Sequence, residues 1–205
     1  MKLRTFLLAL IFALLLISGC TLASNAPEPA TVTPDVMPRL DPAPTPSNST
    51  LPLTCQVTDL NVYINEADGY CFAYPSRFTL GEEPSDKPDV RGPAIGSSVE
   101  PVHVTFGVEV TPATADKTLR EQAEVFLREF SAMDPATFTW SQVQVGGEAA
   151  WMVEPVPARL AWRIVFVQHK GYLFRLFYWP VDILEAKADL DELTQTTLGS
   201  FAFTK

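Results

Sequence analysis

The stretch LAWRIVFVQHKGYLFRLFYW, residues 160–179, decides the fold of this chain. Apolar side chains occupy both alternating faces on either side of Lys170-Gly171, which supplies a turn. A strand exposed on one face alternates apolar with polar residues, whereas a strand covered on both faces does not. We therefore predict two central antiparallel strands, over 159–168 and 172–179, with helices covering both faces of their sheet.

The other strands are predicted from alternation on the amino-terminal side of this hairpin. Residues 102–111 alternate strictly, with valine or phenylalanine at one position and a polar residue or glycine at the next. Asp68-Gly69 and Gly146-Gly147 tolerate the positive φ of tight hairpin turns. Shorter strands are expected around these turns over four ranges: 61–65, 70–75, 139–145 and 149–156.

Two segments have the period of a helix. The first carries apolar residues at helical spacing from Leu119 to Met133, with Thr114 or Asp116 as the candidate N-cap. The second is predicted over 182–198, where acidic residues lie near the start and apolar residues share one face. Antiparallel strands flanked by helices make an α+β fold.

The stretch GYCFAYPS, residues 69–76, resembles the opening motif of PsbP-like domains. The later order is similar too: a strand ending in VGGEA at 145–149, an apolar hairpin, a final helix and a closing LGSFAF at 198–203. The resemblance covers about residues 61–203 and implies an α-β-α sandwich. It also implies protein binding without catalysis, which is the theme of that family. It assigns no binding residue, because fold alone does not establish function.

The amino terminus resembles a bacterial lipoprotein signal. The apolar run 6–17 follows two basic residues and is too short to cross a bilayer, and LISGC ends at Cys20. The resemblance implies that residues 1–19 are removed and that Cys20 carries lipid, including acyl chains such as palmitate. Two alternatives remain: a retained membrane span, or cleavage near TLA at 21–23, which would release a soluble protein.

The two remaining cysteines, Cys55 and Cys71, fit one disulfide in an oxidising compartment. A bridge that closes a loop of this length contributes about 3 kcal/mol. The alternative is a redox pair or a metal site. The chain has no CxxC motif, and its only histidines are His103 and His169, so we favour the structural bridge.

Three parts are expected along the chain. Residues 1–19 form the signal peptide, and residues 20–54 are a proline-rich, disordered tether without an aromatic residue. Residues 55–205 form one globular domain. The formal charge of −9 at pH 7 repels nucleic acid and anionic headgroups, so we expect neither as a partner of the domain.

The usual signatures of catalysis are absent from the sequence. It contains no G-x-S-x-G, S-x-x-K or H-E-x-x-H motif, no phosphate-binding glycine loop and no EF-hand spacing. His103 is expected in a strand and His169 in a turn, both as surface residues rather than bases. We therefore predict no catalytic residue, no cofactor and no metal site. The tryptophans are expected in the core or at its edge: Trp140, Trp151, Trp162 and Trp179.

The segment 81–101 is rich in proline, glycine and charge and shows no periodicity. Long ordered loops are uncommon in compact domains and often have a function. One interpretation is a partner-binding loop, and the other is a flexible excursion with solvated acidic residues. The candidate binding residues of this loop are Glu82, Glu83, Asp86, Asp89 and Arg91.

These features predict an extracytoplasmic lipoprotein, anchored by lipid in the cell membrane or the outer membrane, that acts as a non-catalytic protein-interaction module. The expected partner is a membrane or envelope protein. The alternative is an envelope enzyme or a small-ligand receptor whose site is formed by dispersed residues. A deep pocket with convergent polar groups would favour that alternative, whereas a filled interior would not.

Overall fold

The computed structural model describes residues 52–81, 87–96 and 101–205. Cys20 and the predicted tether up to residue 51 lie outside the described residues. The described strands form two antiparallel sheets. The elements follow in this order: η1 (Leu53–Cys55), β1 (Leu60–Asn65), β2 (Tyr70–Pro75), β3 (Thr79–Leu80), β4 (Asp89–Ile95), β5 (Val102–Pro112), α2 (Leu119–Ser131), η2 (Pro135–Thr137), β6 (Thr139–Val145), β7 (Glu148–Val156), β8 (Trp162–His169), β9 (Tyr172–Trp179), η3 (Leu184–Ala186), α3 (Lys187–Ser200) and β10 (Ala202–Phe203).

The hairpin that decides the fold is β8 and β9, which lies inside a seven-stranded sheet with the order β3-β4-β5-β9-β8-β7-β6. Residues 163–167 of β8 are all buried, so the predicted cover on both faces is confirmed. β8 begins at Trp162 rather than at residue 159. The preceding residues form a bend, in which the Ala161 N–H donates to the Asp182 carboxylate at 3.1 Å.

The predicted hairpin of β1 and β2 is confirmed, but it belongs to a separate three-stranded sheet with β10. β2 is buried along its whole length, because its rings pack on the large sheet. The ring centroids of Tyr70 and Phe174 are 5.9 Å apart, and those of Phe72 and Phe106 are 4.9 Å apart. The α+β fold class is confirmed, and the second sheet is an addition that the sequence pattern did not predict.

α2 begins directly after Thr118, because this residue caps it. The Glu121 N–H donates to the Thr118 hydroxyl at 3.2 Å, and the Thr118 N–H donates to the Glu121 carboxylate at 2.7 Å. This capping box satisfies backbone donors that the helix itself leaves unpaired. The predicted N-caps Thr114 and Asp116 are therefore wrong. Met133, predicted in the apolar stripe, lies beyond the helix end and is 42% exposed.

α3 begins at Lys187 rather than at Asp182, the predicted start. The Asp182 carboxylate accepts the hydrogen bond from the bend before β8, and the short η3 then leads into the helix. The predicted apolar face of the helix is confirmed at Leu190 and Leu193, which are both buried.

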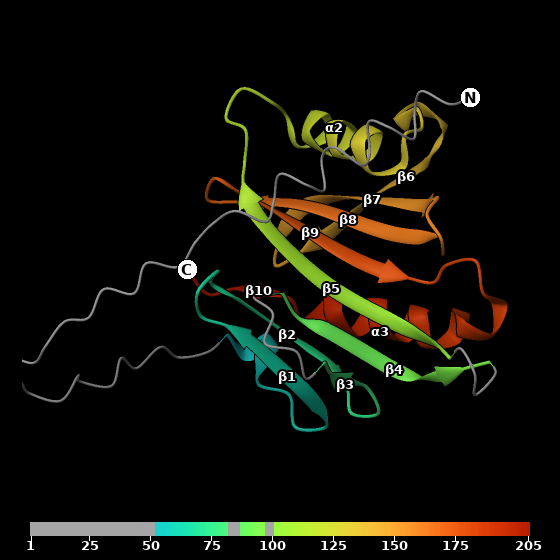
Figure 1. Ribbon diagram of the computed structural model, residues 1–205. Coiled ribbons are helices and arrows are strands. Elements are labelled where there is room, and N and C mark those ends of the chain that lie inside the picture. Colours follow the sequence, from blue (N-terminus) through green and yellow to red (C-terminus); the bar gives the residue numbers. More distant parts are fainter. Residues whose placement is uncertain (1–51, 82–86, 97–100) are drawn as a thin grey trace, which may run out of the picture. The chain divides into compact units, whose positions relative to one another are not determined.

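Different elements cover the two faces of the large sheet (Figure 1). α2 lies over one face, where Leu127 packs against Ile164 and Phe166. α3 and β2 cover the other face, where Leu193 and Leu176 belong to the larger core. Successive residues of β8 and β9 therefore point alternately into two separate cores, which explains why both faces of the hairpin are apolar.

The disulfide predicted between Cys55 and Cys71 is present, with the two Cα atoms 6.2 Å apart. It joins η1 to the buried strand β2, and so fixes the start of the domain to its interior. Constraint of the unfolded chain by such a loop contributes about 3 kcal/mol.

Arg163 connects the central hairpin to α3 through a buried set of polar contacts. Its Nε donates to Glu154 of β7 at 2.6 Å, and its Nη1 donates to the Thr194 hydroxyl of α3 at 2.8 Å. Its Nη2 lies 3.3 Å from the carboxylate of Asp191, also on α3. The two carboxylates and the hydroxyl therefore offset the free-energy cost of burying this guanidinium.

Candidate functional site

The segment 81–101, predicted as a long loop, contains the strand β4. Its register shifts between Arg91 and Ala94, which places the irregularity at Gly92-Pro93. Asp89 and Arg91 of the proposed binding loop lie in this strand and form an ion pair with each other. The loop prediction is therefore wrong for residues 89–95. The other candidates, Glu82, Glu83 and Asp86, lie outside the described residues.

A groove lies beside α2, because this helix packs on β7 and β8 and leaves the adjoining part of the same sheet face open. Its volume is about 380 Å³. We call it the aromatic groove and define it by its rings and the glycine of β5: Gly107, Phe126, Phe130, Trp162, Phe177 and Trp179. All five rings are half-buried.

The rings of the groove pack on one another and form a continuous apolar wall. Trp162 and Trp179 are stacked with their centroids 4.6 Å apart. Phe130 of α2 lies 5.0 Å from Trp162, and Phe177 of β9 lies 5.5 Å from it. Trp162 is thus the centre of the wall, and each ring holds its neighbour in place.

Gly107 leaves the β5 side of the groove open, because it has no side chain there. A Cβ atom at this position would lie 3.3 Å from the Pro88 carbonyl oxygen. Glycine weakens a strand interior and often marks a site where another backbone or a ligand approaches closely. The alternating pattern of β5 thus contains one position at which the sheet surface is hollowed.

Paired charges close one end of the groove. Glu109 lies 2.6 Å from the Lys87 ammonium and 3.0 Å from the Arg175 guanidinium. The Arg175 guanidinium also lies over the Phe126 ring at 4.6 Å. Burial lowers the pKa of Arg175. The negative charges of Glu109 and Glu129 act in the opposite direction and raise this pKa. An arginine remains charged at neutral pH, so this end carries a nearly balanced set of charges.

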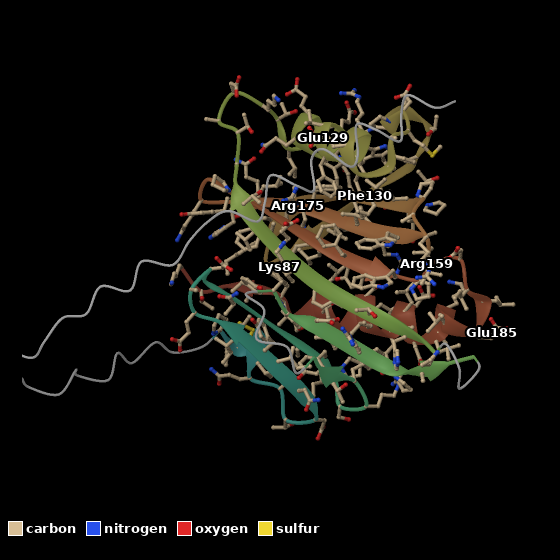
Figure 2. The ribbon with its side chains drawn as sticks, viewed as in Figure 1. Lys87, Glu129, Phe130, Arg159, Arg175 and Glu185 are labelled. Carbon is tan, nitrogen blue, oxygen red and sulfur yellow. A yellow bond between two sulfur atoms is a disulfide. The ribbon has the colours of Figure 1, made fainter. Side chains whose placement is uncertain are left out.

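The other end of the groove opens into a wider hollow of about 620 Å³. Both hollows are lined by Asp89, Trp162 and Trp179, so they form one continuous surface. Arg159 and His103 line the second hollow, and His103 Nδ1 lies 2.9 Å from the Gly92 carbonyl oxygen. Figure 2 shows Lys87 and Arg175 together near the middle of the molecule and Arg159 toward its right side.

Two buried polar atoms beside the groove have no hydrogen-bond partner among the described residues: Asp89 Oδ1 and Arg175 Nε. Buried polar atoms are nearly always paired, so these two are exceptions.

The strongest pKa shifts of tyrosines occur away from the groove, at Tyr70 and Tyr178 in the core, where burial raises the pKa of both phenols. The groove lining in the described residues contains no serine or cysteine.

His169 is the last residue of β8 and not a turn residue as predicted. Its Nδ1 lies 3.0 Å from the Glu148 carboxylate and its Nε2 lies 3.1 Å from the Lys205 carbonyl oxygen. Its ring also stacks on Phe203 at 4.0 Å. This histidine holds the carboxyl terminus against the end of the sheet.

The described part of the chain offers neither a cluster of metal ligands nor a membrane-spanning helix. Among residues 52–81, 87–96 and 101–205, no three histidines, cysteines or carboxylates gather in a way that could hold a metal ion. No helix in the same ranges is long and apolar enough to span a membrane.

No protein-family model and no curated protein matches the chain. Among solved structures, it is similar to cyanobacterial PsbP (CyanoP) of Synechocystis, with a TM-score of 0.48 and 14% identity over 72% of this chain and 94% of that one. The family of that protein is the one that the sequence resemblance named.

Two other solved structures are similar. LpqN of Mycobacterium tuberculosis, a protein involved in cell envelope biogenesis, has a TM-score of 0.47 and 14% identity over 74% of this chain and 95% of that one. A Bacteroides thetaiotaomicron protein has a TM-score of 0.40 and 12% identity over 72% of this chain and 50% of that one. At these levels the likeness describes a fold and carries no function to this chain.

The sequence did not predict the aromatic groove. Trp162 and Trp179 were expected in the core or at its edge, and they lie at an edge that is open to solvent. The available signal was the single glycine of the alternating strand, Gly107, whose position faces the same side of the sheet as these rings. Gly107 can be placed beside these rings only once the pairing of β5 with β9 is known, and the strand pattern alone does not predict that pairing.

Proposed function

We propose that this protein is a lipid-anchored extracytoplasmic module that binds an extended segment of an envelope or membrane protein in the aromatic groove, without catalysis. The observation that carries the proposal is the groove itself: five half-buried rings around a glycine floor, at the place where α2 ends its cover of the sheet. Aromatic side chains in a partly desolvated hollow are the commonest anchors of protein-binding surfaces.

The shape of the surface favours a polymer over a compact ligand. Its lining follows β5 from Val102 to Glu109, which spans roughly 23 Å at about 3.3 Å per residue. An extended peptide of about seven residues has this length. Side chains at alternate positions of such a peptide would meet the rings, while its other side chains would face solvent.

The filled interior argues against the alternative of a receptor with an internal cavity. The space between the large sheet and β2 holds fully buried rings, among them Tyr70, Phe72 and Phe106. Pockets for small molecules are mostly enclosed and well formed. The open groove at the surface suits a partner that contributes its own cover.

The amino-terminal lipid and the tether complete the proposal. Cys20 with two or three acyl chains would hold the protein stably at a membrane, because each buried CH₂ contributes about 0.8 kcal/mol. The proline-rich tether expected over residues 20–54 would allow the groove to reach partners in the same membrane at a high effective concentration.

The proposal predicts that filling the groove removes the partner. In Gly107→Leu the new side chain occupies the groove, whereas in Gly199→Leu it extends from an exposed position of α3, where a Cβ meets nothing within 4 Å. Affinity capture from native membranes is expected to recover one reproducible protein with the natural chain and with Gly199→Leu, and to lose it with Gly107→Leu.

Circular dichroism and thermal unfolding show whether both variants are folded before the capture is compared. Equal recovery by a folded Gly107→Leu variant would contradict a role for the groove. If a Gly107→Leu variant does not fold, Gly107→Ala, which adds a single methyl group, serves in its place and is expected to weaken recovery in the same direction.

A further inference from the structure

We propose, on the basis of the function above, that the segment bound in the aromatic groove carries an acidic side chain beside its apolar residues, and that Arg159 receives it. The acidic end of the segment would lie toward Arg159, and its apolar residues would lie along β5. Three observations support it: the balance of charges at one end of the groove, the excess positive charge at the other, and the continuous apolar wall between them.

The Glu109 end offers no excess charge to a ligand. Glu109 is shared between Lys87 and Arg175, and Glu129 acts on Arg175 from α2. A partner charge of either sign would have to compete with pairs that already exist. This end therefore suits uncharged or apolar parts of the partner.

The Arg159 end is different. Asp89 and Arg91 pair with each other there, and His103 contacts a backbone carbonyl. Arg159 lines the same hollow from the exposed bend before β8, and no ion pair or hydrogen bond joins it to another described residue. One guanidinium thus stands at the end of an aromatic wall, on a chain whose formal charge is −9.

A guanidinium recognises a carboxylate with two parallel N–H donors, and it needs little reorganisation to do so. The stacked rings of Trp162 and Trp179 line the same hollow, so an aliphatic residue next to the carboxylate would lie on the rings. The pattern recognised is therefore an apolar stretch with one or two acidic residues at the end that meets Arg159.

The test uses capped synthetic heptapeptides with an aliphatic, proline-containing body and a terminal pair of aspartates or asparagines. Each peptide is made in two versions, with that pair at its amino end or at its carboxyl end. Comparison of the two versions shows in which direction the peptide binds along β5. Affinities are measured by isothermal titration with the full-length natural protein in detergent and with its Arg159→Gln variant. Arg128→Gln is the matched control, because Arg128 is exposed on α2 and does not line the groove.

The expected result is that one aspartate peptide binds the natural chain about tenfold more tightly than its asparagine counterpart. Arg159→Gln is expected to remove this difference and to leave the asparagine peptide unchanged, and Arg128→Gln to change neither. If both kinds of peptide bind equally and Gly107→Leu abolishes both, the acidic preference is wrong and the groove function stands.

Two other outcomes would contradict both the acidic preference and the proposed peptide site. If Gly107→Leu leaves peptide binding unchanged, or if no peptide binds in the millimolar range, both the inference and the proposed peptide site are wrong. Vesicles of phosphatidylglycerol and an acidic polysaccharide are titrated in parallel. Binding of either that depends on Arg159 and Gly107, where no peptide binds, would assign the groove to lipid or glycan instead.

Discussion

Replacing Arg163 by alanine is expected to destabilise the domain by about 3 kcal/mol. The guanidinium is buried and bonds to Glu154, Asp191 and Thr194 on two neighbouring elements. Its removal leaves two carboxylates near each other without their common counter-charge, and it opens a gap between β8 and α3. The carboxylates are partly exposed, so water compensates some of the loss.

Arg77→Ala is the matched control, because Arg77 also pairs with acidic residues of α3, here Asp189 and Glu192. Its side chain is 41% exposed, and exposed ion pairs contribute at most about 1 kcal/mol. Urea unfolding followed by tryptophan fluorescence gives both free energies. Equal losses for the two arginines, or a larger loss for Arg77→Ala, would contradict the structural role of the buried contacts.

Replacing Cys20 by alanine is expected to abolish incorporation of labelled palmitate completely. The proposed anchor requires the thiol of this residue, and no other side chain in LISGC can accept the diacylglyceryl group. The precursor is also expected to keep its full length, because cleavage of such a signal follows lipidation. Metabolic labelling and mass measurement of the isolated protein give both results.

The control for this experiment removes the other two cysteines together. Cys55→Ser with Cys71→Ser eliminates the disulfide but leaves Cys20, so labelling is expected to persist. If the Cys20→Ala protein is still processed and remains in the membrane fraction, the proposed lipid anchor is wrong.

The elements of this fold were predictable where local pattern and burial agree. The hairpin of β8 and β9 is apolar on both faces because two different cores use it. The same holds for β5, whose alternation matches its burial at Val104, Phe106 and Val108.

Errors arose where contacts distant in sequence decide the structure. β4 contains Gly92-Pro93, which suggested a loop, yet pairing with β5 on both sides of the irregularity makes it a strand. The start of α3 was displaced because Asp182 bonds to Ala161, which lies 21 residues away. β10 pairs with β2 across most of the chain, and no local pattern predicts that contact.

The candidate site was less predictable than the fold for the same reason. Its rings come from α2, β8 and β9, and its floor comes from β5. Each ring taken alone has the pattern of a core residue. α2 covers only β7 and β8 on this face of the sheet. The rings of Trp162, Phe177 and Trp179 therefore remain partly exposed beside the helix.

Photo-crosslinking in living cells shows whether a partner lies in the aromatic groove. Phe130, an aromatic residue at the edge of the groove, is replaced by p-benzoylphenylalanine, and Leu184, which is 81% exposed on η3, is replaced in the same way as the control. We expect the Phe130 position to give one adduct with an envelope or membrane protein. The crosslinked peptide should be apolar with acidic residues at one end, and Gly107→Leu should remove it. Identical adducts from Phe130 and Leu184, or an adduct that persists in Gly107→Leu, would show that the partner does not bind in the groove.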